Sequence, residues 1–88
     1  MLNRVYQTKF VKDVERAKKR GRDLEKLSIV INLLLEEQVL AAKYKNHKLQ
    51  GQYKNHWECH LEPDWLLIYI KAETEIIFAR TGTHSDLF

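Results

Sequence analysis

The feature that most constrains the fold of this 88-residue chain is a change of hydrophobic period along it. From residue 8 to residue 38, apolar residues recur every three or four positions, as on the buried face of a helix: Phe10, Val14 and Ala17, then Leu24, Leu27, Ile31 and Leu34. From Trp57 onward the period is two, which is typical of strands. Separate helical and strand blocks in so short a chain predict a single α+β domain covering residues 1–88.

The helical block divides at Gly21. The first helix is expected over Thr8–Arg20, with Thr8 as its N-cap and Gly21 in the left-handed conformation after its last turn. Asp23 is expected to cap a second helix that ends near Gln38. The short Gly-Arg link predicts an antiparallel helical hairpin.

The strand block predicts a three-stranded antiparallel meander. Its expected strands are residues 57–62, 65–70 and 75–81, with Pro63 and Asp64 forming the first turn. The run "WLLIYI" predicts a central strand covered on both faces, and "NRVYQ" near the N-terminus predicts a short edge strand. Residues 39–56 lack a period and are expected to form a loop.

Charge is distributed unevenly along the chain. Residues 1–54 hold 13 Lys and Arg against 6 Asp and Glu, whereas residues 55–88 hold 2 against 6. The basic half is suited to a polyanion, although a solvated helix face and a soluble loop would carry the same charge. The apolar run Ile29–Leu35 is far shorter than the ~20 residues that span a bilayer, no secretory signal is evident, and the single Cys59 fits a buried hydrophobe in a reducing compartment. We therefore expect a cytoplasmic protein that does not contact membranes.

The segment "HWECHLEPDW", residues 56–65, concentrates groups that can carry chemistry. His56 and His60 have the i, i+4 spacing of two zinc ligands on a helix, but Trp57 stands where the H-E-x-x-H motif requires Glu. On a strand these positions lie about 13 Å apart at ~3.3 Å per residue, too far to share one ion. No metal site and no cofactor are predicted.

Acid-base chemistry is the remaining interpretation, because the unperturbed pKa of His lies near 6.5 and supplies both protonation states near neutrality. Cleavage of RNA needs a base for the ribose 2′-OH, an acid for the leaving 5′-oxygen, and a cation for the phosphorane. His, Asp and Arg could supply these groups. Four His residues in 88 are, however, more often surface or hydrogen-bonded residues than catalysts.

The segments "YKNHKLQGQYKNHWECHLEPDWLLIY" and "ARTGTHSDLF", together with the helical hairpin, resemble the YafQ branch of the RelE/ParE toxin superfamily. The matching motifs are H-x-L-x-G, C/A-H-x-x-P-D-W and R-x-G-[TS]-H-x-x-L-F. This resemblance implies a hairpin packed on an antiparallel sheet that the N-terminal strand joins. It also implies ribosome-dependent cleavage of mRNA, neutralisation by a cognate antitoxin protein, and binding of operator DNA only by the toxin–antitoxin complex.

By this resemblance the catalytic residues would be His47, His60, Asp64, Arg80 and His84. Asp64 and His60 would act on the base side and His84 as the general acid. Arg80 would stabilise the phosphate charge, and His47 would position the phosphate or share the base role. Trp65 and Phe88 match positions that the family places around the scissile RNA.

Each of these residues also has an ordinary structural interpretation. His60 could pair with Glu58 or Glu62 on an exposed sheet face, Trp65 could belong to the core, and Phe88 could be a terminal anchor. Arg80 shares its parity with Ile76 and Phe78, so it needs an anionic partner, either a phosphate or a carboxylate such as Asp64 or Glu58. His56 matches no site position and is expected to be exposed.

Six basic residues of the helical block are predicted to include contacts to ribosomal RNA: Lys9, Lys12, Lys18, Lys19, Arg20 and Arg22. Two other functions stay open at this stage. A ParE-like inhibitor of a topoisomerase would share the fold without requiring the histidines, and a non-catalytic RNA- or partner-binding module would need only the basic half.

Overall fold

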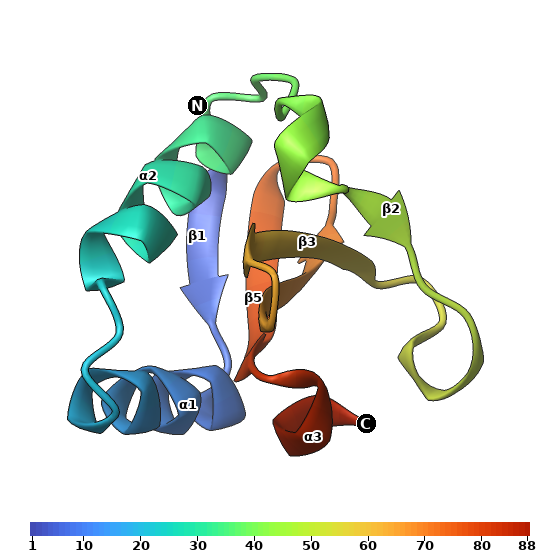
Figure 1. Cartoon of the computed structure of the whole chain (residues 1–88). Helices are drawn as coiled ribbons and strands as arrows, with labels where there is room; N and C mark the ends of the chain where they lie inside the picture. The colour runs from blue at the N-terminus through green and yellow to red at the C-terminus, as the bar shows by residue number, and fades with distance from the viewer.

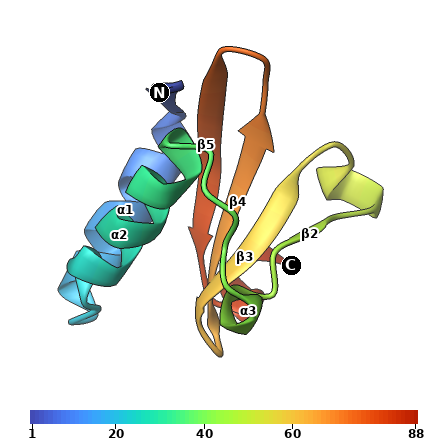
Figure 2. The same ribbon diagram turned by 90° about the horizontal axis from the view of Figure 1, so that it is seen from above.

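The computed structural model describes residues 1–88 and contains one five-stranded sheet of order β1-β5-β4-β3-β2. Two helices lie along one side of this sheet, as Figures 1 and 2 show. The chain runs through β1 (Asn3–Tyr6), α1 (Thr8–Lys19), α2 (Leu24–Leu35), the short helix η1 (Ala42–Tyr44), β2 (His47–Lys48), the short helix η2 (Gly51–Tyr53), β3 (Trp57–Glu62), β4 (Trp65–Lys71), β5 (Glu75–Gly82) and α3 (His84–Leu87). The predicted α+β architecture is confirmed, and no helix is long and apolar enough to cross a bilayer.

The ends of the helices follow local sequence chemistry, but the predicted N-cap of α1 and the predicted last residue of α2 are corrected. Gln7, not Thr8, is the N-cap of α1, and no side chain caps this end. Gly21 adopts φ 77°, and the N–H of Arg22 reaches the carbonyl of Ala17, which is the closure expected after a helix. Asp23 caps α2 as predicted, accepting from the N–H of Glu25.

The second helix ends at Leu35, three residues before the predicted Gln38. Glu37 takes a left-handed φ of 58°, and the N–H of Gln38 closes back onto the carbonyl of Leu33. The helix therefore stops through the same type of backbone closure that glycine provides in α1, but with a glutamate at the left-handed position. Sequence rules that look for Gly or Asn there do not find this end.

The predicted helical hairpin is present but open. From the Gly21–Arg22 link the two helices diverge, with α1 at one end of the sheet and α2 running up beside β1 (Figure 1). Most of the contacts that α1 makes with the sheet are to β5. A groove of about 350 Å³ with mainly apolar walls lies between the helices.

The meander was predicted correctly, and β1 joins it by pairing parallel with β5. The predicted loop holds one unexpected strand, β2, which pairs antiparallel with β3 so that His47 lies opposite Glu58. This short pairing matters because it brings a histidine from the loop onto the sheet.

The two faces of the sheet are packed differently. On the helix-covered face, 15 buried residues form the main core, including Leu35, Leu67 and Phe78. On the opposite face only Leu66, Ile68, Ala79 and Leu87 are buried together, with Leu49 and Tyr53 at their edge. The second face is the open face of the sheet, and it carries most of the predicted site residues.

Candidate active site

Three histidines that are far apart in sequence gather on the open face. His47 comes from β2, His60 from β3 and His84 from the start of α3. The ring centroids of His47 and His60 are 6.4 Å apart, and those of His60 and His84 are 5.9 Å apart. The row continues to Phe88, whose ring centroid lies 6.4 Å from that of His84. The histidines predicted as site residues therefore form one cluster.

His84 is held by Asp64. Oδ1 of this carboxylate accepts from the His84 backbone N–H at 2.9 Å and from its ring Nδ1 at 2.6 Å. The backbone hydrogen bond, with the ring contact second, holds the pKa of Asp64 below its usual range. Asp64 is therefore ionised near neutral pH, Nδ1 of His84 carries the proton, and Nε2 is left for chemistry.

The turn that presents His84 is fixed by a capping box. Thr83 accepts from the N–H of Asp86, while the Asp86 carboxylate accepts from the N–H of Thr83. Gly82 is required next to it, because a Cβ there would lie 2.9 Å from Oδ2 of Asp86. The sequence "GTHSD" thus encodes a rigid platform for the histidine.

His47 and His60 share a carboxylate that the sequence did not identify as part of the site. Oε2 of Glu58 lies 3.2 Å from Nε2 of His47 and 3.5 Å from Nε2 of His60. The period of two predicted an exposed Glu58, but it is only 5% exposed, since β2 and the two rings cover it. The carbonyl of Lys45 lies 2.7 Å from Nδ1 of His47 and can only accept, so this nitrogen is protonated too.

Arg80 has a partner that was not predicted. Its guanidinium binds Asp13 of α1, with Nε 2.7 Å from Oδ2, and not Asp64 or Glu58. Asp13 is buried and also accepts from Arg16 and from the N–H of Thr81. Hydrogen bonding to Asp13 raises the pKa of Arg80, with a smaller contribution from Tyr53.

A β-bulge explains why parity misplaced Arg80. Tyr69 pairs with Phe78 but Ile68 pairs with Arg80, so Ala79 is an extra residue in β5. Phe78 lies in the main core, whereas Ala79 packs with Ile68 in the cluster of the open face. Arg80 therefore leaves the face of Ile76 and Phe78 and joins the face of the histidines.

Trp65, which was predicted to contact substrate, lies in the core. Its side chain is 1% exposed in the main core, because β4 is covered on both faces, and the guanidinium of Arg22 lies over its ring at 5.5 Å from the centroid. Phe88 is 59% exposed and packs edge-on against Tyr53, whose hydroxyl donates to the carbonyl of Leu87. Phe88 is thus available to a ligand.

His56 is half-buried rather than fully exposed as predicted, since its ring contacts the edge of Tyr53. Its Nδ1 lies 3.1 Å from the carbonyl of Lys54. No group of three His, Cys, Asp or Glu residues in the structure is arranged to hold a metal ion.

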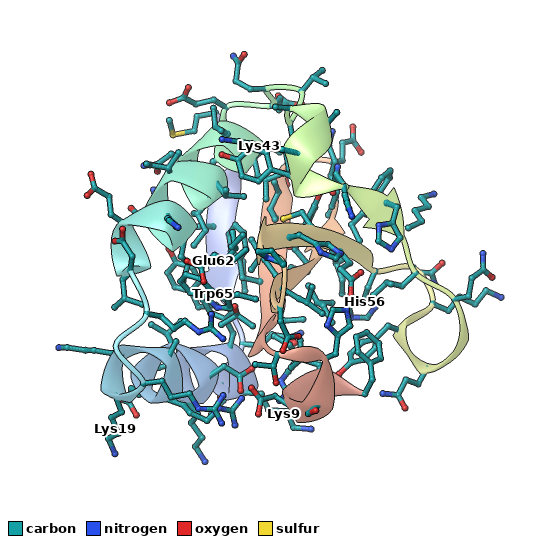
Figure 3. The ribbon with its side chains drawn as sticks, in the orientation of Figure 1. Lys9, Lys19, Lys43, His56, Glu62 and Trp65 are labelled. Atoms are coloured by element: carbon teal, nitrogen blue, oxygen red, sulfur yellow. The ribbon has the colours of Figure 1, made fainter.

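The six basic residues of the helical block fall into two groups. Arg20 binds Asp86 at 2.7 Å and Arg22 binds Glu62 at 2.8 Å, so both arginines are engaged within the protein. The four lysines Lys9, Lys12, Lys18 and Lys19 are exposed on α1, and Figure 3 shows Lys9 and Lys19 at the end of the molecule away from η1. The lysines are therefore the better candidates for contact with a polyanion.

Comparison with known proteins gives the same assignment by sequence and by structure. The family model described as "Bacterial toxin of type II toxin-antitoxin system, YafQ" matches residues 2–88. The mRNA interferase toxin YafQ of Escherichia coli K12 is 44% identical over 84 residues, which cover 94% of this chain and 91% of the relative.

Two solved structures illustrate the structural match. YafQ in the E. coli DinJ–YafQ toxin–antitoxin complex is 42% identical with a TM-score of 0.92, covering 99% of this chain and 97% of that one. A metal-bound toxin from Helicobacter pylori is 44% identical with a TM-score of 0.93, and each chain is covered completely. The chain belongs to the YafQ family of bacterial toxins of type II toxin–antitoxin systems.

Proposed function

We propose that this toxin is an endoribonuclease that cleaves mRNA on the ribosome by attack of a ribose 2′-oxygen on the adjacent phosphate. The observation that carries the proposal is the pair of oriented histidines on the open face. His47 and His84 each have Nδ1 held by an oxygen acceptor; Nε2 of His84 is left for chemistry, whereas Nε2 of His47 faces Glu58 at 3.2 Å. The relative from E. coli K12 that carries the name mRNA interferase supports the same activity.

The reaction divides between the two ends of the histidine row. The ring of His60, beside Glu58, accepts the proton of the 2′-hydroxyl, while His47, whose two ring nitrogens both face oxygen acceptors, positions the phosphate. The 2′-oxygen then bonds to phosphorus while the bond from phosphorus to the 5′-oxygen breaks. His84 in its imidazolium form gives the Nε2 proton to that leaving oxygen, which yields a 2′,3′-cyclic phosphate and a 5′-hydroxyl.

Asp64 has a different role in this scheme from the base role first expected. Its lowered pKa makes it a weak base, and it contacts His84. It orients the His84 ring by holding Nδ1. The base side falls to His60, with Glu58 as the carboxylate that it shares with His47.

Arg80 stabilises the negative charge that develops on the phosphorane. Asp13 accepts a hydrogen bond from Nε of Arg80, and Nη2 of Arg80 lies 3.3 Å from the same carboxylate. The remaining guanidinium hydrogens are free to donate to a phosphate oxygen. Phe88, exposed at the end of the histidine row, offers an aromatic face to a base.

The partners follow from the same proposal. An antitoxin protein neutralises the toxin, as the DinJ–YafQ structure of the E. coli relative suggests, and operator DNA is bound only through the toxin–antitoxin complex. The lysines of α1 contact ribosomal RNA, and the protein acts in the cytoplasm, where its substrate is.

The decisive test is a message with one 2′-deoxy nucleotide on the 5′ side of the scissile bond. It should enter the ribosome but stay uncut there, since the nucleophile has been removed. Unmodified message should give a cyclic or 3′-phosphate and a 5′-hydroxyl fragment. A 5′-phosphate product, or cutting at the deoxy position, would show that water is the nucleophile.

The same assay tests metal dependence, which is relevant because a relative is known in a metal-bound form. We expect chelation of metal bound by the toxin to leave the rate unchanged at a magnesium level that keeps ribosomes intact. A rate that falls on chelation and returns with added metal would contradict a mechanism based on His, Asp and Arg alone. Intact message together with inhibited topoisomerase would instead identify a ParE-like activity.

A further inference from the structure

A cleft of about 510 Å³ adjoins the histidine cluster on the side that faces α2. Three separate parts of the chain form its walls: Lys26 and Ile29 of α2, Lys43–Lys45 at the end of η1, and His60–Pro63 at the end of β3. His60 belongs both to the cleft and to the catalytic cluster. A molecule bound in the cleft would therefore extend directly into the active site.

The charge of the cleft favours an anion. Three lysines line it against one carboxylate, that of Glu62, which is already bound by Lys26 at 2.9 Å and by Arg22 at 2.8 Å. Lys43 and Lys45 form no ion pair, and the ammonium of Lys43 lies over the ring of Tyr44 at 5.2 Å from the centroid. Figure 3 shows Lys43 beside the space between η1 and α2.

The rest of the lining is apolar and suits a flat ring. Ile29, Leu61 and Pro63 also line the cleft, and Tyr44 forms part of its wall with the Lys43 ammonium over its ring. Ile29 is a large apolar residue that is half exposed on α2. A phosphate with an attached base needs this combination of cations and apolar surface.

The cleft is also connected to the histidine cluster, through the backbone of Lys45. Lys45 has a left-handed backbone, with φ 49°, and its carbonyl is the acceptor that orients the His47 ring. A ligand that holds the Lys43–Lys45 segment would therefore help to hold His47. This link would tie occupancy of the cleft to the alignment of a catalytic ring.

We propose that this cleft binds the nucleotide next to the scissile phosphate of the mRNA. Lys43 and Lys45 contact its phosphate, and its base or ribose packs against Ile29 and Pro63. The proposal rests on the proposed function for its connection to catalysis, but binding to the cleft can be measured without cleavage. An acidic peptide could meet the same lysines, yet the continuity with His60 favours the nucleotide.

The test compares Ile29→Glu with Val11→Glu, using fluorescence anisotropy with a labelled RNA trinucleotide that is 2′-O-methylated and so cannot be cut. Ile29 is 48% exposed and Val11 is 46% exposed on a different helix, so the two variants change charge equally at similar sites. We expect about tenfold weaker binding for Ile29→Glu and less than a twofold change for Val11→Glu. Equal affinities for the two variants would overturn the cleft as a nucleotide site.

A second pair of variants, Lys43→Gln and Lys71→Gln, removes one exposed lysine inside the cleft or outside it. Only Lys43→Gln should weaken binding of the trinucleotide. It should also raise the KM for mRNA cleavage on ribosomes, while kcat stays near the wild-type value. If hexaglutamate displaces the trinucleotide at a lower concentration than unlabelled RNA does, the cleft is a peptide site and the proposal is wrong. If both cleft variants bind normally while His84→Ala abolishes cleavage, the cleft assignment fails and the proposed function stands.

Discussion

The two faces of the sheet divide the tasks of the protein. The helix-covered face holds the 15-residue core, in which the Phe78 ring packs at a tilt against Phe10, with ring centroids 5.8 Å apart. The open face buries a cluster of only four residues and carries histidines that remain half exposed, at 49% for His47 and 55% for His84. Substitutions on the two faces should therefore change different properties, with stability affected on one face and catalysis on the other.

The largest effect is expected on the open face from His84→Ala. Loss of the general acid should slow cleavage by about 10²-fold to 10⁴-fold, while the fold and ribosome binding are kept because the side chain is exposed. Single-turnover cleavage on programmed ribosomes and circular dichroism measure the two properties. His56→Ala, on the same side of the molecule but outside the cluster, is the control and should cleave normally. Full toxicity of a well-expressed His84→Ala protein would remove His84 from the mechanism.

Two phenylalanines test the comparison directly. Phe78→Ala empties a fully buried site and should lower the free energy of unfolding by about 3–5 kcal/mol, with the rate per folded molecule unchanged. Phe88→Ala removes an exposed ring, so it should change the free energy of unfolding in urea little but should slow cleavage. If both variants lowered stability equally, the division between the faces would be wrong.

Asp13→Asn probes the place where the faces meet, since Asp13 is a buried residue of α1 and binds Arg80 of the open face. Removing its charge should cost about 3 kcal/mol of stability and slow cleavage by misplacing Arg80. A double-mutant cycle with Arg80→Met separates the two effects. The double variant should recover part of the stability and none of the activity. Recovery of cleavage in the double variant would mean that Arg80 has no part in the reaction.

Asp86→Asn should produce a smaller, pH-dependent effect. The hydrogen bond from Arg20, with the N–H of Thr83 next, lowers the pKa of Asp86 far below its usual range. Because the folded pKa is the lower one, this stabilisation is present above the ordinary Asp value of about 3.9 and is lost as pH falls toward the folded pKa. At pH 7 the free energy of unfolding, measured with urea, should be about 1 kcal/mol higher for wild type than for Asp86→Asn. A gap that stayed constant down to pH 2 would argue against the ion pair.

The smallest effect per residue is expected from the exposed lysines of α1. Changing Lys9, Lys12, Lys18 and Lys19 to Gln should weaken ribosome binding and flatten its dependence on salt, because fewer counterions are released. The stability of the isolated toxin should change little. Filter binding across a salt series measures the slope, and a slope equal to that of wild type would place the ribosome contact elsewhere.

Local patterns were sufficient for most of the helices and strands, and the family motifs picked out the histidines that gather on the open face. Period and capping chemistry located α1, α2 and the meander within a few residues, because these signals act over one or two turns of chain. The motifs around His47, His60 and His84 named the cluster through resemblance to the family. The error at the end of α2 has a local cause too, since Glu37 replaces the glycine that usually marks such an end.

Only the tertiary structure decided which groups meet. Asp13 and Arg80 are 67 residues apart, and no period in either segment links them. Glu58 became a buried member of the site because β2 pairs over it, and Arg80 changed faces because one extra residue, Ala79, enters β5. The sequence by itself determined the helices, most of the strands and the types of side chain proposed for catalysis. Their partners depend on long-range pairing and on a bulge, which hydrophobic period does not encode, because they are selected by the packing of the whole sheet.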